Sequence, residues 1–141
     1  MLFHFDLVYA AEDAQFIMPF VNLGLVPEGG SSLAAPLVFG RAKAGELLML
    51  GEPLSARDGE ASGFVTRILP ADKVQDHARS RVADLLARPP QALAKTRKLM
   101  ADNREAVLAQ IEVEAKVFAG ALKGPEVQRA IAEFFAKRAN G

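Results

Sequence analysis

Residues 22–36 read NLGLVPEGGSSLAAP and place one acidic side chain, Glu28, in an unusual turn. Pro27 fixes one backbone angle before it, and the two glycines after it allow a tight turn with backbone close to a neighbouring group. Ser31 or Ser32 is then placed to cap the helix that follows. The stretch therefore predicts a carboxylate at the start of a helix, between two apolar runs, where it can work as an acid or a base.

The composition fits one globular domain without a strongly charged partner. The chain has 141 residues, half of them hydrophobic, and 17 basic side chains balance 17 acidic ones. A chain of this length can bury a core of its own. Residues 1–54 hold six acids and two bases, whereas residues 55–141 hold eleven acids and fifteen bases. The basic excess is typical of a solvated helical surface, although it can also favour an anionic ligand; neither nucleic acid nor a membrane is expected as a partner.

Several classes of site and location are excluded. The chain has no cysteine and only two histidines, 73 positions apart, so we expect neither a disulfide nor a metal site. Acidic residues interrupt the apolar start, so no signal peptide or membrane span is expected. The final four residues, RANG, are not a peroxisomal address. A soluble cytoplasmic protein is the resulting expectation.

The remaining pattern predicts about three short strands followed by helices, with roughly two thirds of the chain helical. The predicted strands are 7–11, 15–19 and 64–69. The predicted helices are 42–50, 55–61 (begun by a capping box at Ser55 and Asp58), 71–87, 91–102, 105–122 and 126–138. Apolar residues at helical spacing predict a core-facing stripe on the two longest helices. Its positions are Val74, His77, Ala78, Val82, Leu85 and Leu86 on one helix, and Val107, Leu108, Ile111, Ala115, Val117 and Phe118 on the other.

Three other kinds of site can be weighed and set aside. Ser31 or Ser32 with His77 and an acid would make a catalytic triad, but the sequence Gly-x-Ser-x-Gly is absent and His77 is on a predicted core-facing position. His4 lies between two phenylalanines, which favours a packed core histidine over a catalyst. The Gly-Gly-Ser that follows Glu28 lacks the Gly-Lys-Ser/Thr of a phosphate-binding loop.

Glu28 itself has two interpretations. A surface turn glutamate would be favoured there by the helix dipole. Its apolar neighbours Leu25, Val26 and Leu33 favour a working acid or base, because desolvation raises the pKa of a carboxylate toward the useful range, while the helix start opposes this. The residues alone leave both interpretations open.

Taken in order, the segments of the chain resemble the crotonase (enoyl-CoA hydratase/isomerase) superfamily. They are DLVYAAEDAQF (6–16), PFVNLGLVP (19–27) with GGSS (29–32), GRAKAGELLMLGEPLSA (40–56), GFVTRILP (63–70), RPPQAL (88–93) and FFAKR (134–138). The resemblance covers the whole chain but only the C-terminal half of a family domain. It implies an α/β crotonase-like fold, a spiral of ββα units, with residues 1–70 as the end of the core and residues 71–141 as a helical trimerisation region.

The resemblance also implies a mechanism that uses an enolate held by two backbone N–H groups, which would lie upstream of residue 1 together with the first hydratase glutamate. At the position of the second hydratase glutamate this chain has Phe20, which cannot carry a proton. The turn at Glu28 instead resembles the Δ3,Δ2-enoyl-CoA isomerases, in which a single glutamate moves the proton. Glu28 is thus the expected catalytic residue.

Further expectations follow from the family. Phe20, Met18 and Leu23 would line the acyl pocket, and Lys137 would approach the coenzyme A of a neighbouring subunit. Acyl-CoA is then the substrate, in fatty-acid β-oxidation, with no cofactor, and the assembly a homotrimer or a dimer of trimers. The alternatives are an enoyl-CoA hydratase, or a truncated fragment without catalytic activity that serves oligomerisation.

Overall fold

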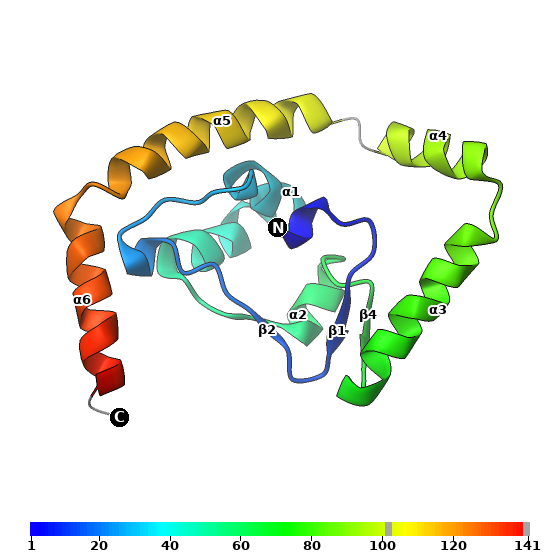
Figure 1. Cartoon of the computed structure of the whole chain (residues 1–141), viewed down its shortest axis with the longest axis horizontal. Helices are drawn as coiled ribbons and strands as arrows, with labels where there is room; N and C mark the ends of the chain where they lie inside the picture. The colour runs from blue at the N-terminus through cyan, green and yellow to red at the C-terminus, as the bar shows by residue number, and fades with distance from the viewer. Residues whose placement is uncertain (101–102, 140–141) are drawn as a thin grey trace.

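The computed structural model describes residues 1–100 and 103–139, with side chains up to residue 133 (Figure 1). Its first half combines short strands and turns with the helices α1 and α2, and its second half is helical. In chain order the elements are η1 (Leu2–His4), β1 (Tyr9–Ala11), β2 (Gln15–Phe16), η2 (Val21–Leu23), α1 (Ser31–Gly45), η3 (Glu46–Leu50), β3 (Leu54–Ser55), α2 (Ala56–Ala61), β4 (Arg67–Leu69), η4 (Ala71–Lys73), α3 (Val74–Leu86), α4 (Pro90–Met100), α5 (Arg104–Ala121) and α6 (Pro125–Ala139).

The strands form two small sheets. β1 and β4 are parallel, with Ala10 opposite Ile68, and β2 and β3 are antiparallel. Beyond the first pair the Thr66 N–H donates to the Val8 carbonyl at 2.7 Å, and the Val8 N–H donates to Thr66 Oγ1 at 3.0 Å. The three predicted strands are confirmed, each shorter than expected. β3 was not predicted, because two residues are too short to show an alternating pattern.

Helix α1 continues into η3, a π-helical turn that ends at Gly51. Gly51 has φ +68°, which is the left-handed conformation that commonly ends a helix. The predicted end at this glycine is confirmed. The predicted start at residue 42 is close to the observed break, because α1 consists of two helical stretches that meet across a kink at Gly40 (φ 74°, ψ 162°). Glycine tolerates this non-helical conformation, so the second helical stretch begins directly after Gly40.

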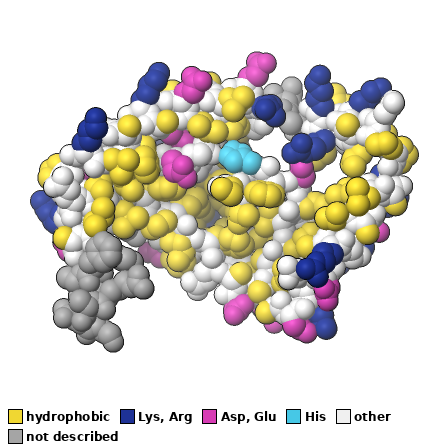
Figure 2. All heavy atoms as spheres, viewed as in Figure 1, with side chains coloured by type: hydrophobic (Ala, Val, Ile, Leu, Met, Phe, Trp, Pro, Cys, Tyr) yellow, Lys and Arg dark blue, Asp and Glu magenta, His cyan; other side chains and the backbone are white. Residues whose placement is uncertain are grey.

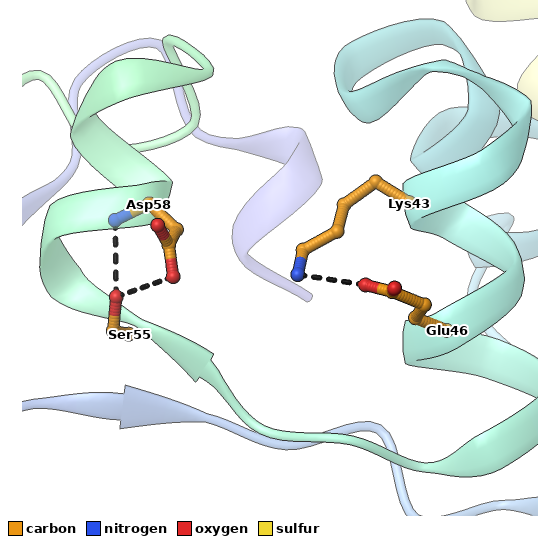
Figure 3. Close-up of polar contacts among 4 residues, drawn as sticks. All are labelled: Lys43, Glu46, Ser55 and Asp58. Atoms are coloured by element: carbon orange, nitrogen blue, oxygen red, sulfur yellow. Dashed lines mark hydrogen bonds and ion pairs between the residues drawn. The ribbon is translucent and has the colours of Figure 1, made fainter.

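The predicted cap of α2 is confirmed. Ser55 Oγ accepts a hydrogen bond from the Asp58 N–H at 3.1 Å and donates one to Asp58 Oδ2 at 2.7 Å (Figure 3). Figure 3 also shows the pair formed by Lys43 Nζ and Glu46 Oε2, 2.8 Å apart on the surface. The hydrogen bond that Lys43 donates to Glu46 raises the pKa of Lys43 above its ordinary value. Both contacts fasten helix ends and involve no part of the Glu28 turn.

Two apolar clusters form the core, and Phe64 joins them. The first contains Val8, Ala10, Ala56 and Val65, with Ala14, Phe16, Phe64 and Ile68 packed against it. The second contains Ala35, Ala44 and Leu48, with Phe3, Met18, Phe20 and Phe39 packed against it. The Phe64 ring lies 5.2 Å from Phe16, 5.1 Å from Phe3 and 5.3 Å from Phe39, measured between ring centres. These aromatic contacts connect the strands to α1.

Helices α3 to α6 follow one another around the periphery of this core (Figure 1). The stripe predicted to face the core on α3 is therefore wrong over its second half: Val82, Leu85 and Leu86 are exposed, Leu86 to 81%. On α5, Leu108 and Val117 are exposed as well. Helices α3 to α6 contact the core only in places. Within the described residues, much of the apolar stripe on α3 and α5 is therefore not covered by another part of the chain. No helix among those residues has the length and apolar character needed to cross a membrane.

The limits of the predicted helices are otherwise close to those observed. The predicted end of the fourth helix near residue 102 lies outside the described residues, as do the side chains of Phe134, Phe135 and Lys137. The division into residues 1–70 and 71–141 stays a prediction. It falls at Pro70, between β4 and η4.

Candidate active site

The Glu28 turn, residues 27–30, joins an extended stretch to α1 through two glycines. Gly29 has φ +66° and Gly30 φ +75°, and glycine adopts these angles without the steric cost that other residues meet. The Glu28 carbonyl accepts hydrogen bonds from the Ser31 N–H at 3.2 Å and from Ser31 Oγ at 2.7 Å. The backbone of Glu28 is thereby tied to the first turn of α1, while its side chain is exposed.

Neither serine caps α1 as predicted. The residue at the N-cap position is Gly30, and no side chain caps the helix locally. Ser31 and Ser32 are instead the first helical residues, and their hydroxyl groups bond to Glu28 and to Glu114. The capping prediction failed because the N-cap is the left-handed Gly30, so the helix begins at Ser31 and both serines lie inside it.

Glu114 of α5 supplies the missing cap from 84 positions along the chain. Its Oε2 accepts the Gly30 N–H at 2.5 Å, and its Oε1 accepts the Ser32 N–H at 2.9 Å and Ser32 Oγ at 2.5 Å. Gln110 Nε2 donates to Ser32 Oγ at 2.9 Å and completes the group. Glu114 is 5% exposed, and its three donors match the acceptor-only character of an ionised carboxylate.

His4 contacts the same turn from the other side. Its Nε2 lies 2.6 Å from the Gly29 carbonyl oxygen, which only accepts, so Nε2 is the donor. The sequence predicted a packed core histidine, and this is wrong: His4 is exposed at the end of η1. The prediction relied on the two neighbouring phenylalanines as core residues. Phe5 is itself exposed, and the short 3₁₀ turn η1 places His4 at the surface, beside the Glu28 turn.

Beside Glu28 is an open apolar hollow of about 210 Å³. One side of α5 lines most of it, and the Glu28 turn closes one end. The lining residues are Glu28, Gly29, Ile111, Ala115, Phe118, Ala119 and Leu122. Glu28 is the single ionisable group among them. In Figure 2 hydrophobic side chains cover much of the middle of the face, and lysine and arginine gather along its upper edge, over α4 and α5.

The other predicted site residues lie elsewhere. Met18 and Phe20 pack against the second apolar cluster, and Leu23 ends η2. None of the three lines the hollow beside Glu28. Their role in substrate binding stays a prediction, and the side chain of Lys137 lies outside the described residues.

The serine–histidine triad is not assembled. Both serine hydroxyls bond within the Glu28–Glu114 group, and the His77 ring packs edge-on against Tyr9 with ring centres 4.8 Å apart. This agrees with the interpretation of His77 as a packing residue. The functional candidate that the sequence did not reveal is Glu114. Its signal was an acid on the stripe of Val107, Ile111 and Phe118, where a buried charge requires a partner.

Comparison with known proteins places the chain in one family. The sequence model described as enoyl-CoA hydratase/isomerase matches residues 1–140. The human protein named enoyl-CoA delta isomerase 2 is 33% identical over 135 residues, which is 95% of this chain and 34% of that protein. The chain thus spans about a third of that relative.

Solved structures agree. A crystal structure of an enoyl-CoA hydratase/isomerase from Pseudoalteromonas atlantica T6c has a TM-score of 0.92 at 36% identity, over 96% of this chain and 55% of that one. The structure of Pseudomonas aeruginosa OdaA has a TM-score of 0.91 at 39% identity, over 94% and 55%. The fold is therefore the expected α/β crotonase-like fold, represented by a mostly helical portion that spans about half of these chains. The chain belongs to the enoyl-CoA hydratase/isomerase family.

The geometry of the turn predicts that its two glycines differ in importance. A Cβ added at Gly30 would lie 3.1 Å from Val107 Cγ1 and 3.4 Å from Ile111 Cγ1, whereas one added at Gly29 meets nothing within 4 Å. Both alanine variants carry the left-handed strain, about 1–2 kcal/mol. We expect Gly30→Ala to lower the free energy of unfolding by more than Gly29→Ala in urea titrations, because only Gly30 is pressed against α5. Equal losses in the two variants would contradict the close packing of α5 on the turn.

Proposed function

We propose that the complete protein is an enoyl-CoA isomerase that moves a 3-enoyl-CoA double bond to position 2, with Glu28 as the proton carrier. One observation carries the proposal: Glu28 is the single ionisable side chain on the apolar hollow. A carboxylate beside an apolar wall is suited to proton transfer at carbon. The similarity to a human protein that is named an enoyl-CoA delta isomerase supports the same reaction.

The reaction needs one group that first accepts and then returns a proton. As a carboxylate, Glu28 takes a proton from C2, and the electrons of that C–H bond delocalise into the thioester to form a dienolate. As a neutral acid, Glu28 then gives the proton to C4, and the double bond forms between C2 and C3. The proposal assigns enolate stabilisation to backbone N–H groups outside residues 1–141. No cofactor is required, because the substrate is only rearranged.

A hydratase is the runner-up within the family. Water addition is served there by two carboxylates, and the position of the second one is Phe20 in this chain. Phe20 packs against the apolar core, and the hollow offers Glu28 no acidic partner. These observations favour isomerisation. A third possibility, a non-catalytic oligomerisation fragment, applies to residues 1–141 taken alone.

The substrate class proposed is an acyl-CoA thioester whose aliphatic part contacts apolar surface near Glu28. Met18, Phe20 and Leu23 are retained as proposed acyl-pocket residues, and Lys137 as a proposed coenzyme A contact from a neighbouring subunit. A role in fatty-acid β-oxidation and a cytoplasmic location belong to the same proposal. We propose no nucleic-acid or membrane partner.

The exposed apolar residues of α3 and α4 support assembly into a homotrimer or a dimer of trimers. They are Val82, Leu85, Leu86, Leu93, Leu99 and Met100. Exposed apolar surface on neighbouring elements is typical of a protein interface when it is extensive. The resemblance to the crotonase family gives the proposed stoichiometry.

Replacement of the proposed proton carrier tests the function. In the complete protein, Glu28→Gln should lower kcat for 3-enoyl-CoA isomerisation by about 10²- to 10⁴-fold, the usual contribution of a general acid–base group. Glu12→Gln, at an exposed turn glutamate, is the matched control and should keep wild-type activity. Absorbance assays with purified protein measure both. Near-wild-type turnover in Glu28→Gln would refute the assignment.

The assembly can be measured by light scattering. The complete protein should show a mass of three or six copies, and Leu86→Glu should lower that mass, because it places a charge on the exposed apolar surface of α3. Gln75→Glu, exposed on the same helix, should leave the mass unchanged. A monomeric wild-type protein would contradict the proposed oligomer.

A further inference from the structure

A buried carboxylate that takes no part in the proposed proton transfer holds the turn that carries Glu28. Glu114 is almost completely buried, and a charge in that position is stable only when hydrogen bonds satisfy it. All three of its donors come from Gly30 and Ser32. These are the second and fourth residues after Glu28. Glu114 therefore binds the backbone that determines where the Glu28 side chain begins.

The turn needs such a contact because its own backbone is soft. Gly29 and Gly30 are successive glycines in the left-handed region, and glycine has many other accessible conformations. The bond from the Gly30 N–H to Glu114 holds the peptide group that links the two glycines. His4 holds the same peptide group through its carbonyl oxygen, that of Gly29. Two residues that are distant in sequence thus select one conformation of the turn.

Glu114 also occupies the donors that would attract Glu28. The N–H groups at the start of a helix bind carboxylates, and Glu28 lies close enough in sequence to compete for those of α1. Glu114 already accepts the Gly30 and Ser32 N–H groups. Among the described residues the Glu28 carboxylate accepts no hydrogen bond, and Glu28 lines the hollow instead.

We propose that Glu114 is a positioning residue for Glu28: it fixes Gly30 and occupies the N–H groups at the start of α1, so that the Glu28 carboxylate faces the apolar hollow and not the helix. This inference rests on the proposed function, in which Glu28 carries the proton. Glu114 itself does not touch the substrate in this arrangement.

The test compares Glu114→Gln with Glu112→Gln in the complete protein. Glu112 lies on the same helix and is exposed, so its replacement is a matched control. The amide at position 114 keeps one acceptor oxygen but turns an NH₂ group toward an N–H or O–H donor. We expect kcat for 3-enoyl-CoA isomerisation to fall about 10- to 100-fold, as for a displaced catalytic group, with KM changed less than about twofold. Glu112→Gln should match wild type.

A double variant shows whether Glu114 acts through Glu28. If it does, Glu28→Gln/Glu114→Gln should be no slower than Glu28→Gln alone, because the group being positioned is already lost. A merely structural role would lower the activity of the double variant further, by the factor seen in Glu114→Gln alone. Multiplied losses, or a Glu114→Gln enzyme with unchanged kcat, would overturn the inference and leave the function of Glu28 intact.

The failure of the proposed function gives a different result. An active Glu28→Gln enzyme would remove both the function and the positioning role. If Glu114→Gln does not fold, Ser32→Ala takes its place in the same test; it removes the hydroxyl contacts with Glu114 and Gln110 and keeps the Ser32 N–H bond to Glu114. We expect a smaller fall in kcat, an unchanged KM, and no further loss in the Glu28→Gln background. An unchanged kcat in Ser32→Ala would then overturn the inference.

Discussion

The first turn of α1 depends on one buried carboxylate from another helix. A buried ion costs several kcal/mol in lost hydration, and Glu114 recovers this through three hydrogen bonds and the positive end of the helix dipole. The dependence is mutual. Without Glu114 the N–H groups of Gly30 and Ser32 would lose their partners in a poorly hydrated place, at about 1–3 kcal/mol for each unsatisfied group.

The same helix that caps α1 supplies the apolar wall beside Glu28. Ile111 lies three residues before Glu114, and Ala115 and Phe118 lie one and four residues after it, so these side chains share one side of α5. Capping and lining are therefore coupled: α5 cannot hold the start of α1 without also passing beside the Glu28 turn. This single packing contact therefore places Glu28 next to a hydrophobic surface. It also leaves the Gly30 and Ser32 N–H groups bonded to Glu114 and not available to Glu28.

Much of the local structure could be predicted from sequence, because it depends on neighbours in the chain. Ser55 caps α2, Gly51 ends η3, and the Glu28 turn precedes α1. The long-range contacts could not. Glu114 and Gly30 are 84 positions apart in the sequence. Hydrophobic periodicity identifies the apolar face of a helix but not the segment that packs against it.

The two incorrect predictions at the site have the same origin. The serines of α1 are replaced as caps by Glu114, and His4 leaves the core to bind the Gly29 carbonyl. In each case a tertiary hydrogen bond overrode a local preference. The prediction that the apolar stripe of α3 faces the core failed for a related reason. An amphipathic pattern indicates that one face of a helix is apolar, but it does not say which part of the structure packs against that face.

We propose that one carboxylate, Glu28, oriented by α5, makes the complete protein an isomerase. Measuring both family reactions on a single preparation of the complete protein tests it most directly, with 3-enoyl-CoA for isomerisation and 2-enoyl-CoA for hydration. A site with Glu28 as its only working acid should isomerise 3-enoyl-CoA faster than it hydrates 2-enoyl-CoA. Faster hydration would mean that a second proton carrier serves the site, and would contradict the account.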